Sequence, residues 1–168
     1  TIIILDADGT IFDSNYAIYK VWQIIANEYN RDIFSDFNHF KKIFMKHHGK
    51  WESYAIHEFG FEETDFEKII GIWLNVVDKI YEEYTKWLDG MIEVLPILEK
   101  RKYTIAIATN NDKEIFEGLF RKQNMSYEIH DQLAHKGKLK PSPDMIFDHM
   151  HKLGFSQENT VMIGDTIT

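Results

Sequence analysis

The 168-residue chain contains no cysteine, which excludes disulfide bonds, thiolate metal ligands and cysteine nucleophiles. This composition fits a reducing compartment. No apolar run approaches the ~20 residues that a membrane-spanning helix needs, and nothing in the sequence resembles a signal peptide. We therefore expect a cytoplasmic protein without a membrane partner.

Basic residues are also scarce. The chain has 19 Lys and Arg against 27 Asp and Glu, a formal net charge of −8. This charge repels polyanions, and no convincing basic patch offsets it, so we expect no nucleic-acid partner. With 44% hydrophobic and 14% aromatic residues, the chain is typical of a globular protein, and its length allows one core with a modest insertion.

Four short apolar runs rich in branched residues predict β-strands, at residues 2–5, 103–108, 127–130 and 160–163. The segments between the last three runs have helical spacing. This alternation predicts an α/β fold, in which helices pack on both faces of a parallel sheet. Asn111 and Glu114 resemble a capping box that begins one of these helices.

The segment between the first two runs is far too long for a single crossover helix. Apolar residues recur there at helical spacing, and Thr64 with Glu67 resembles a capping box for its last helix. We therefore expect a helical insertion over residues 15–88, placed within a core formed by residues 1–14 and 89–168.

Two acidic residues, Asp6 and Asp8, follow the first apolar run in "LDADGT". Asp-Gly between apolar residues is a hairpin signal, which is the simplest interpretation. However, the uninterrupted run favours a strand buried on both faces, and at its carboxyl end the two side chains would project to one side, about 6.6 Å apart. Two like charges there raise one pKa and leave the other group ionised, which separates a nucleophile or metal ligand from a proton donor.

Four motifs in order resemble those of the haloacid dehalogenase-like hydrolases. "IIILDADGTIFDS" is similar to the first, Thr109-Asn110 at the end of "IAIATN" to the second, Lys140 in "KLKPSPDMI" to the third, and Gly164-Asp165 after "TVMI" to the fourth. The resemblance implies a Rossmann-like three-layer core with strand order 3-2-1-4. A helical cap between the first two motifs resembles that of phosphoglycolate phosphatase-like members.

The resemblance also implies roles for individual residues. Asp6 would attack a phosphoryl group and form an aspartyl-phosphate, while Asp8 would act as acid and base. The implied catalytic residues are Asp6, Asp8, Thr109 and Lys140; the implied phosphate-binding residues are Gly9, Thr109, Asn110 and Lys140. The implied Mg²⁺ site consists of Asp6, Asp165 and the carbonyl of Asp8.

The end of the fourth motif and one loop of the cap allow further expectations. In the family the fourth motif continues to a second acidic residue, and a further strand and helix follow, so we expect the core to continue beyond Thr168. In the cap, the loop "KHHGKWES" is the candidate for substrate selection through His48, Lys50 and Trp51. Surface residues at a helix end are the alternative interpretation of this loop.

The sequence therefore predicts a Mg²⁺-dependent phosphatase that acts on a small phosphorylated metabolite. A phosphomutase similar to β-phosphoglucomutase would use the same motifs, and a non-catalytic module that binds phosphorylated ligands is the alternative from a different class. The aspartate at position 8 argues against dehalogenase and phosphonatase chemistry.

Overall fold

A computed structural model describes residues 1–47, 50–130 and 139–165. The chain divides into two compact units, one formed by residues 1–14 with 86–168 and the other by residues 15–85. We call them the α/β unit and the helical unit. None of the helices in the described ranges is long and apolar enough to cross a membrane.

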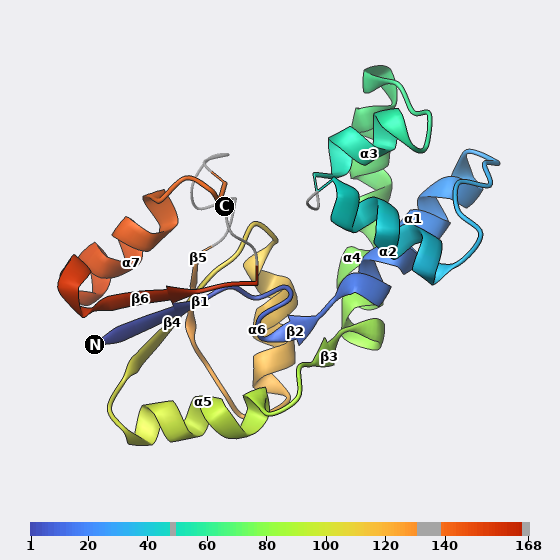
Figure 1. The fold of residues 1–168 in the computed structure, drawn as a ribbon. Helices are drawn as coiled ribbons and strands as arrows, with labels where there is room; N and C mark the ends of the chain where they lie inside the picture. The colour runs from blue at the N-terminus through green and yellow to red at the C-terminus, as the bar shows by residue number, and fades with distance from the viewer. Residues whose placement is uncertain (48–49, 131–138, 166–168) are drawn as a thin grey trace. The chain divides into compact units, whose positions relative to one another are not determined.

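The α/β unit contains a parallel sheet of four strands in the order β5-β4-β1-β6 (Figure 1). β1 (Ile2–Leu5) lies between β4 (Thr104–Ala108) and β6 (Thr160–Ile163), and β5 (Glu128–His130) pairs with β4. All four residues of β1 are buried because both faces of the sheet are covered. The predicted α/β fold and its 3-2-1-4 strand order are confirmed.

Helices cover both faces of this sheet. α5 (Met91–Lys100) and α6 (Lys113–Arg121) lie on one side and α7 (Asp144–Leu153) on the other (Figure 1). Under α7, the alternate residues Ile2 and Ile4 of β1 form a buried cluster with Met145 and neighbouring apolar side chains. The period of two along the strand therefore divides its side chains between two apolar layers.

A second, two-stranded sheet follows the turn after β1. β2 (Phe12–Asp13) pairs antiparallel with β3 (Lys86–Trp87). The buried Phe12 ring lies with its centroid 4.6 Å from that of Trp87, and it also packs against Phe116 and Phe120 of α6. This aromatic cluster fixes the segment that follows Gly9 against the main body of the unit.

The helical unit consists of α1 (Asn15–Glu28), α2 (Phe37–Lys46), α3 (Trp51–His57), a 3-10 turn (Glu63–Asp65) and α4 (Phe66–Tyr84). Its interior is aromatic. The indole of Trp22 in α1 donates a hydrogen bond of 2.9 Å to the hydroxyl of Tyr54 in α3, and both side chains are buried. Burial raises the pKa of Tyr54, so the hydroxyl stays neutral.

The entry to α4 differs from the predicted capping box of Thr64 and Glu67, which is wrong. The reciprocal hydrogen bonds form two residues earlier, between Glu62 and Asp65, and the backbone N–H of Glu62 donates to the Asp65 carboxylate at 3.0 Å. Two acidic side chains can satisfy each other's backbone N–H groups in the same way as a Thr–Glu pair. The extra 3-10 turn is the result.

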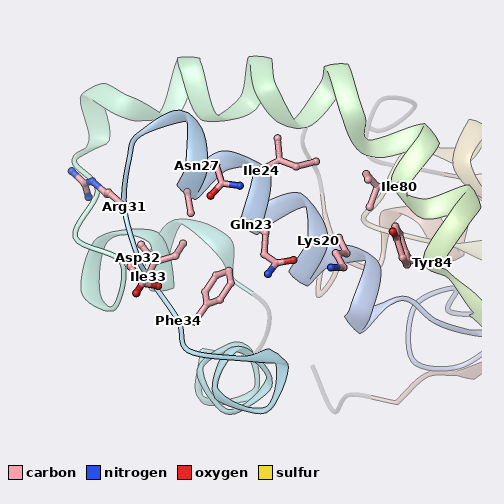
Figure 2. A pocket seen from close by; sticks show the side chains of 11 residues that line it. Lys20, Gln23, Ile24, Asn27, Arg31, Asp32, Ile33, Phe34, Ile80 and Tyr84 are labelled. Carbon is pink, nitrogen blue, oxygen red and sulfur yellow. The ribbon is translucent and has the colours of Figure 1, made fainter.

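A cavity of about 380 Å³ lies within the helical unit between α1, residues 31–34 and the end of α4 (Figure 2). Lys20 contributes an ammonium group close to three tyrosine rings, at 5.3 to 5.7 Å. Ile24, Phe34 and Ile80 add apolar surface, and Asp32 is the single carboxylate of the lining. A lone carboxylate cannot act as both nucleophile and proton donor, whereas the α/β unit carries two neighbouring acidic residues, Asp6 and Asp8.

The Trp22–Tyr54 hydrogen bond gives a first test of this packing. Replacing Tyr54→Phe leaves the buried indole N–H without its acceptor, and we expect the free energy of unfolding to fall by about 1–3 kcal/mol in urea denaturation of the whole chain. Tyr16→Phe serves as the control because Tyr16 is exposed. Equal loss of stability in the two variants would contradict the assignment.

Candidate active site

The parallel register brings the ends of three strands to one edge of the sheet. Leu5 at the end of β1 lies opposite Ile163 of β6, and the backbone N–H of Asp6 donates to the Ile163 carbonyl at 2.9 Å. Thr109 directly follows β4, the other neighbour of β1. Asp165 follows β6 after Gly164, so residues distant in sequence meet at the carboxyl edge.

Asp6 forms an ion pair with Lys140. The Lys140 Nζ lies 2.5 Å from Asp6 Oδ1, and the two side chains are only 13% and 14% exposed. The pKa of Asp6 is raised above its ordinary value because burial outweighs the opposing effect of Lys140, and the Asp165 carboxylate adds to the rise. The predicted nucleophile and the predicted phosphate-binding cation are therefore direct partners.

Asp8 has a different environment. Burial raises its pKa to about 6, with a further contribution from the negative charge of Asp6. The hydroxyl of Ser14 donates a hydrogen bond to Asp8 Oδ1, and this bond, the Lys140 charge and the Asn111 side chain hold the pKa from rising further. Asp8 can therefore take up or release a proton slightly below neutral pH, as an acid and base must.

Two of the residues around Asp8, Ser14 and Asn111, are absent from the sequence-based set. Ser14 is almost fully buried, and it lies at the end of β2, six residues beyond Asp8. Only the turn between β1 and β2 brings the two together. The serine is present in the "IFDS" end of the first motif, but its spacing alone does not indicate which carboxylate it reaches.

Gly9 makes room for Asp165. Its φ of +76° lies in the left-handed region, and a Cβ added there would lie 2.2 Å from Asp165 Oδ2. The Asp165 carboxylate therefore packs directly against the backbone of the loop that carries Asp6 and Asp8. A side chain at position 9 would displace it.

These oxygen atoms fit a small hard cation. Asp165 is close enough to Asp6 for its charge to raise the pKa of Asp6. Within the described ranges, no three acidic or histidine side chains form a complete metal site. The two carboxylates, the Asp8 carbonyl and water could hold a Mg²⁺ ion, because this ion usually takes one or two carboxylates and keeps several waters.

Thr109 is fully buried at the end of β4. Its Oγ1 accepts a hydrogen bond of 3.0 Å from the backbone N–H of Asn111, which leaves the hydroxyl hydrogen to donate elsewhere. The predicted capping box of Asn111 and Glu114 is wrong. Asn111 lies in the turn before α6, and α6 begins at Lys113 with Asp112 as its N-cap. Asn111 is thereby left beside Asp8.

The Asn110 side chain binds the main chain around Lys140. Its Nδ2 donates to the Lys140 carbonyl at 3.1 Å, and its Oδ1 accepts from the Lys140 N–H at 2.8 Å. The sequence places Asn110 among the phosphate-binding residues. In the structure its carboxamide is engaged with the protein backbone.

The candidate residues for substrate selection lie in the helical unit. Lys50 is exposed and precedes α3, and the Trp51 ring packs against Phe66 with centroids 4.8 Å apart. His48 lies outside the described residues. The structure thus joins Asp6, Asn110 and Lys140 through hydrogen bonds and an ion pair and packs Asp165 against Gly9. Asp8 and Thr109 lie at the same sheet edge, while Lys50 and Trp51 lie in the helical unit.

Comparison with known proteins identifies the family of the chain. A model of the family "Haloacid dehalogenase-like hydrolase" matches residues 3–168, so the chain belongs to this family and is a hydrolase of the haloacid dehalogenase-like type. The family predicted from the four motifs is confirmed.

Individual relatives are distant in sequence. The chain is 21% identical over 168 residues to the "Putative pyrophosphatase PpaX" of Caldanaerobacter subterraneus subsp. tengcongensis, and the match covers 99% of this chain and 73% of that protein. Among solved structures, a HAD family hydrolase from Deinococcus radiodurans R1, with bound phosphate and sodium, aligns with a TM-score of 0.68 at 20% identity, over 98% of this chain and 72% of that one. A "putative phosphoglycolate phosphatase" from Lactobacillus plantarum gives 0.77 at 19% identity, over 99% and 77%.

The raised pKa of Asp8 predicts a pH-dependent gain in stability for Asp8→Asn in metal-free protein. In the wild type the folded state binds the Asp8 proton more tightly than the unfolded state, so ionisation destabilises the fold as the pH rises from about 4 to about 6. We expect the variant to match the wild type below pH 4 and to exceed it by up to about 3 kcal/mol above pH 6. Urea denaturation across this range measures the difference.

Asp89→Asn is the control for this series because Asp89 is exposed. Its stability difference from the wild type should stay nearly constant with pH. A constant difference for Asp8→Asn as well would show that Asp8 titrates normally.

Proposed function

We propose that this protein is a Mg²⁺-dependent phosphatase that hydrolyses a small phosphomonoester through an aspartyl-phosphate on Asp6. The observation that supports it best is the pairing of Asp6 with Lys140 at 2.5 Å beside an Asp8 whose pKa is about 6. This arrangement places a nucleophile, a fixed positive charge and a proton donor together at one edge of the sheet.

In the first step an Asp6 carboxylate oxygen attacks phosphorus while the bond from phosphorus to the leaving oxygen breaks. Both the Lys140 ammonium and the Ala7 N–H contact Oδ1, at 2.5 and 2.8 Å, so the described contacts leave Oδ2 as the freer oxygen. Asp8 in its protonated form transfers its proton to the leaving oxygen. Lys140 offsets negative charge on the phosphoryl oxygens, which is the main requirement of phosphoryl transfer.

In the second step water attacks phosphorus, and the bond from phosphorus to Asp6 breaks. Asp8, now ionised, takes a proton from that water and returns to its starting state. The buried Ser14 hydroxyl keeps the Asp8 carboxylate in one orientation through both transfers. Thr109 would donate its hydroxyl hydrogen to a phosphoryl oxygen at the end of β4.

Mg²⁺, when bound, supplies positive charge to the phosphoryl oxygens and the nucleophile. Asp6, Asp165 and the carbonyl of Asp8 would hold it. The close packing of Asp165 on Gly9 supports this assignment, because it places the second carboxylate against the loop that carries the first.

Phosphate release from a panel of phosphomonoesters tests the proposal. The panel contains phosphoglycolate, sugar phosphates, nucleotides and a chromogenic aryl phosphate, each with and without Mg²⁺. We expect turnover that needs Mg²⁺ and falls at least about 1,000-fold in Asp6→Asn, because the nucleophile is lost, while Asp89→Asn retains it. Wild-type turnover that survives Asp6→Asn, or no turnover on any compound, would contradict the proposal.

We further propose that Lys50 and Trp51 select the substrate. Lys50 is an exposed cation directly before α3, and it could contact a polar or anionic part of the substrate away from the reacting phosphoryl group. On the same panel, Lys50→Ala should change the ratio of kcat/KM between two substrates by about 10-fold. Lys42→Ala, an exposed lysine of α2, is the matched control; unchanged ratios in Lys50→Ala would refute the role.

A further inference from the structure

We propose that Asn110 is a positioning residue that acts through Lys140, by holding the Lys140 main chain where its ammonium group meets Asp6. The catalytic consequence of this inference depends on the proposed phosphatase function. The inference itself concerns a contact between two segments that are 30 residues apart in sequence.

The contact has the geometry of a clamp. The Asn110 carboxamide donates to the Lys140 carbonyl and accepts from the Lys140 N–H, at 3.1 and 2.8 Å. Two hydrogen bonds in opposite directions to one residue fix both its distance and its orientation, as neighbouring strands do. A short carboxamide has both groups at its tip, whereas alanine at this position would have neither.

Lys140 needs such a clamp because no regular element holds it. It belongs neither to a strand nor to a helix, and α7 begins only at Asp144. Among the described backbone hydrogen bonds near it, Ser142 N–H to the Leu139 carbonyl is local to the turn. Asn110, in contrast, is the second residue after β4, a strand that pairs with β1 and therefore has a fixed position relative to Asp6.

The position of the main chain determines where the ammonium group lies. Lysine carries its charge at the end of a flexible four-carbon side chain. The charge is therefore localised only if the backbone from which the side chain extends is fixed. The Lys140 and Asp6 side chains are nevertheless mostly buried and 2.5 Å apart. Asn110 thus connects the rigid sheet to the main chain of a cation on an irregular segment.

A double-mutant cycle tests this inference in the full-length chain. The variants are Asn110→Ala, Lys140→Met, which keeps most of the lysine stem, and the double variant. If Asn110 acts through Lys140, Asn110→Ala should lower kcat/KM for the aryl phosphate about 10-fold in the wild type and have no further effect once the ammonium group is absent. The double variant then equals Lys140→Met.

Affinity for inorganic phosphate, measured by calorimetry with Mg²⁺ present, gives a second cycle that does not need turnover. We expect the same pattern there, with a loss of about 10-fold that disappears in the Lys140→Met background. The melting temperature of Asn110→Ala should stay close to that of Asn159→Ala, a surface control. If Asn110 had a merely structural role, Asn110→Ala would lower the melting temperature, and its fold-loss would multiply with that of Lys140→Met in both cycles. This result would overturn the inference.

The two proposals fail in different ways. If the wild type hydrolyses no phosphomonoester, the phosphatase function is wrong, and the phosphate-binding cycle still tests Asn110. If turnover is normal but the effects of the two substitutions multiply, the function stands and the positioning role is wrong.

Discussion

The ion pair between Lys140 and Asp6 is the interaction on which the described site depends. A carboxylate that is mostly removed from water is costly unless an opposite charge and hydrogen bonds compensate it, and a lysine in the same place has the same requirement. Each therefore stabilises the other only while both are held at short distance. The sheet fixes Asp6 directly, and the main chain of Lys140 must be fixed by other means.

The strand order satisfies part of this requirement. β1 lies in the interior of the sheet with hydrogen-bonded neighbours on both sides, so the residue after it has little freedom. The end of β4 supplies Thr109 and Asn110, and the end of β6 supplies Asp165. Three segments, well separated in sequence, thus contribute polar groups to one edge because parallel strands end on the same side.

Much of this arrangement follows from local patterns. The uninterrupted run before Asp6 predicts a strand buried on both faces, and the later runs predict its neighbours because apolar residues with branched side chains favour that environment. The spacing of Asp6 and Asp8 predicts a site at the strand end. The strand predictions are confirmed because each depends on residues adjacent in sequence and on a fold in which the helices cover both sheet faces.

Other features could not be predicted because they depend on competition between neighbours or on tertiary contacts. Glu62 and Asp65 cap the helical turn in preference to Thr64, although threonine is a preferred N-cap residue and glutamate is not. From the sequence, the Asn110 side chain could equally contact a ligand or the backbone. It contacts the backbone because the tertiary fold places the Lys140 main chain beside it. The Ser14 hydroxyl reaches Asp8 only because β2 folds back after Gly9, where the Phe12 ring is anchored by aromatic neighbours.

The charges at the sheet edge give a physical reason for a cation in the proposed reaction. Within the described residues, the carboxyl groups of Asp6, Asp8 and Asp165 lie at this edge together with the ammonium group of Lys140, which pairs with Asp6. Even with Asp8 protonated, the sum is −1, and a phosphomonoester adds further negative charge. A divalent cation reverses this balance, so that an acidic protein can hold a phosphoryl group beside its own nucleophile. The raised pKa of Asp8 contributes to the same end, because the proton needed by the leaving group also removes one negative charge from the site before the substrate binds.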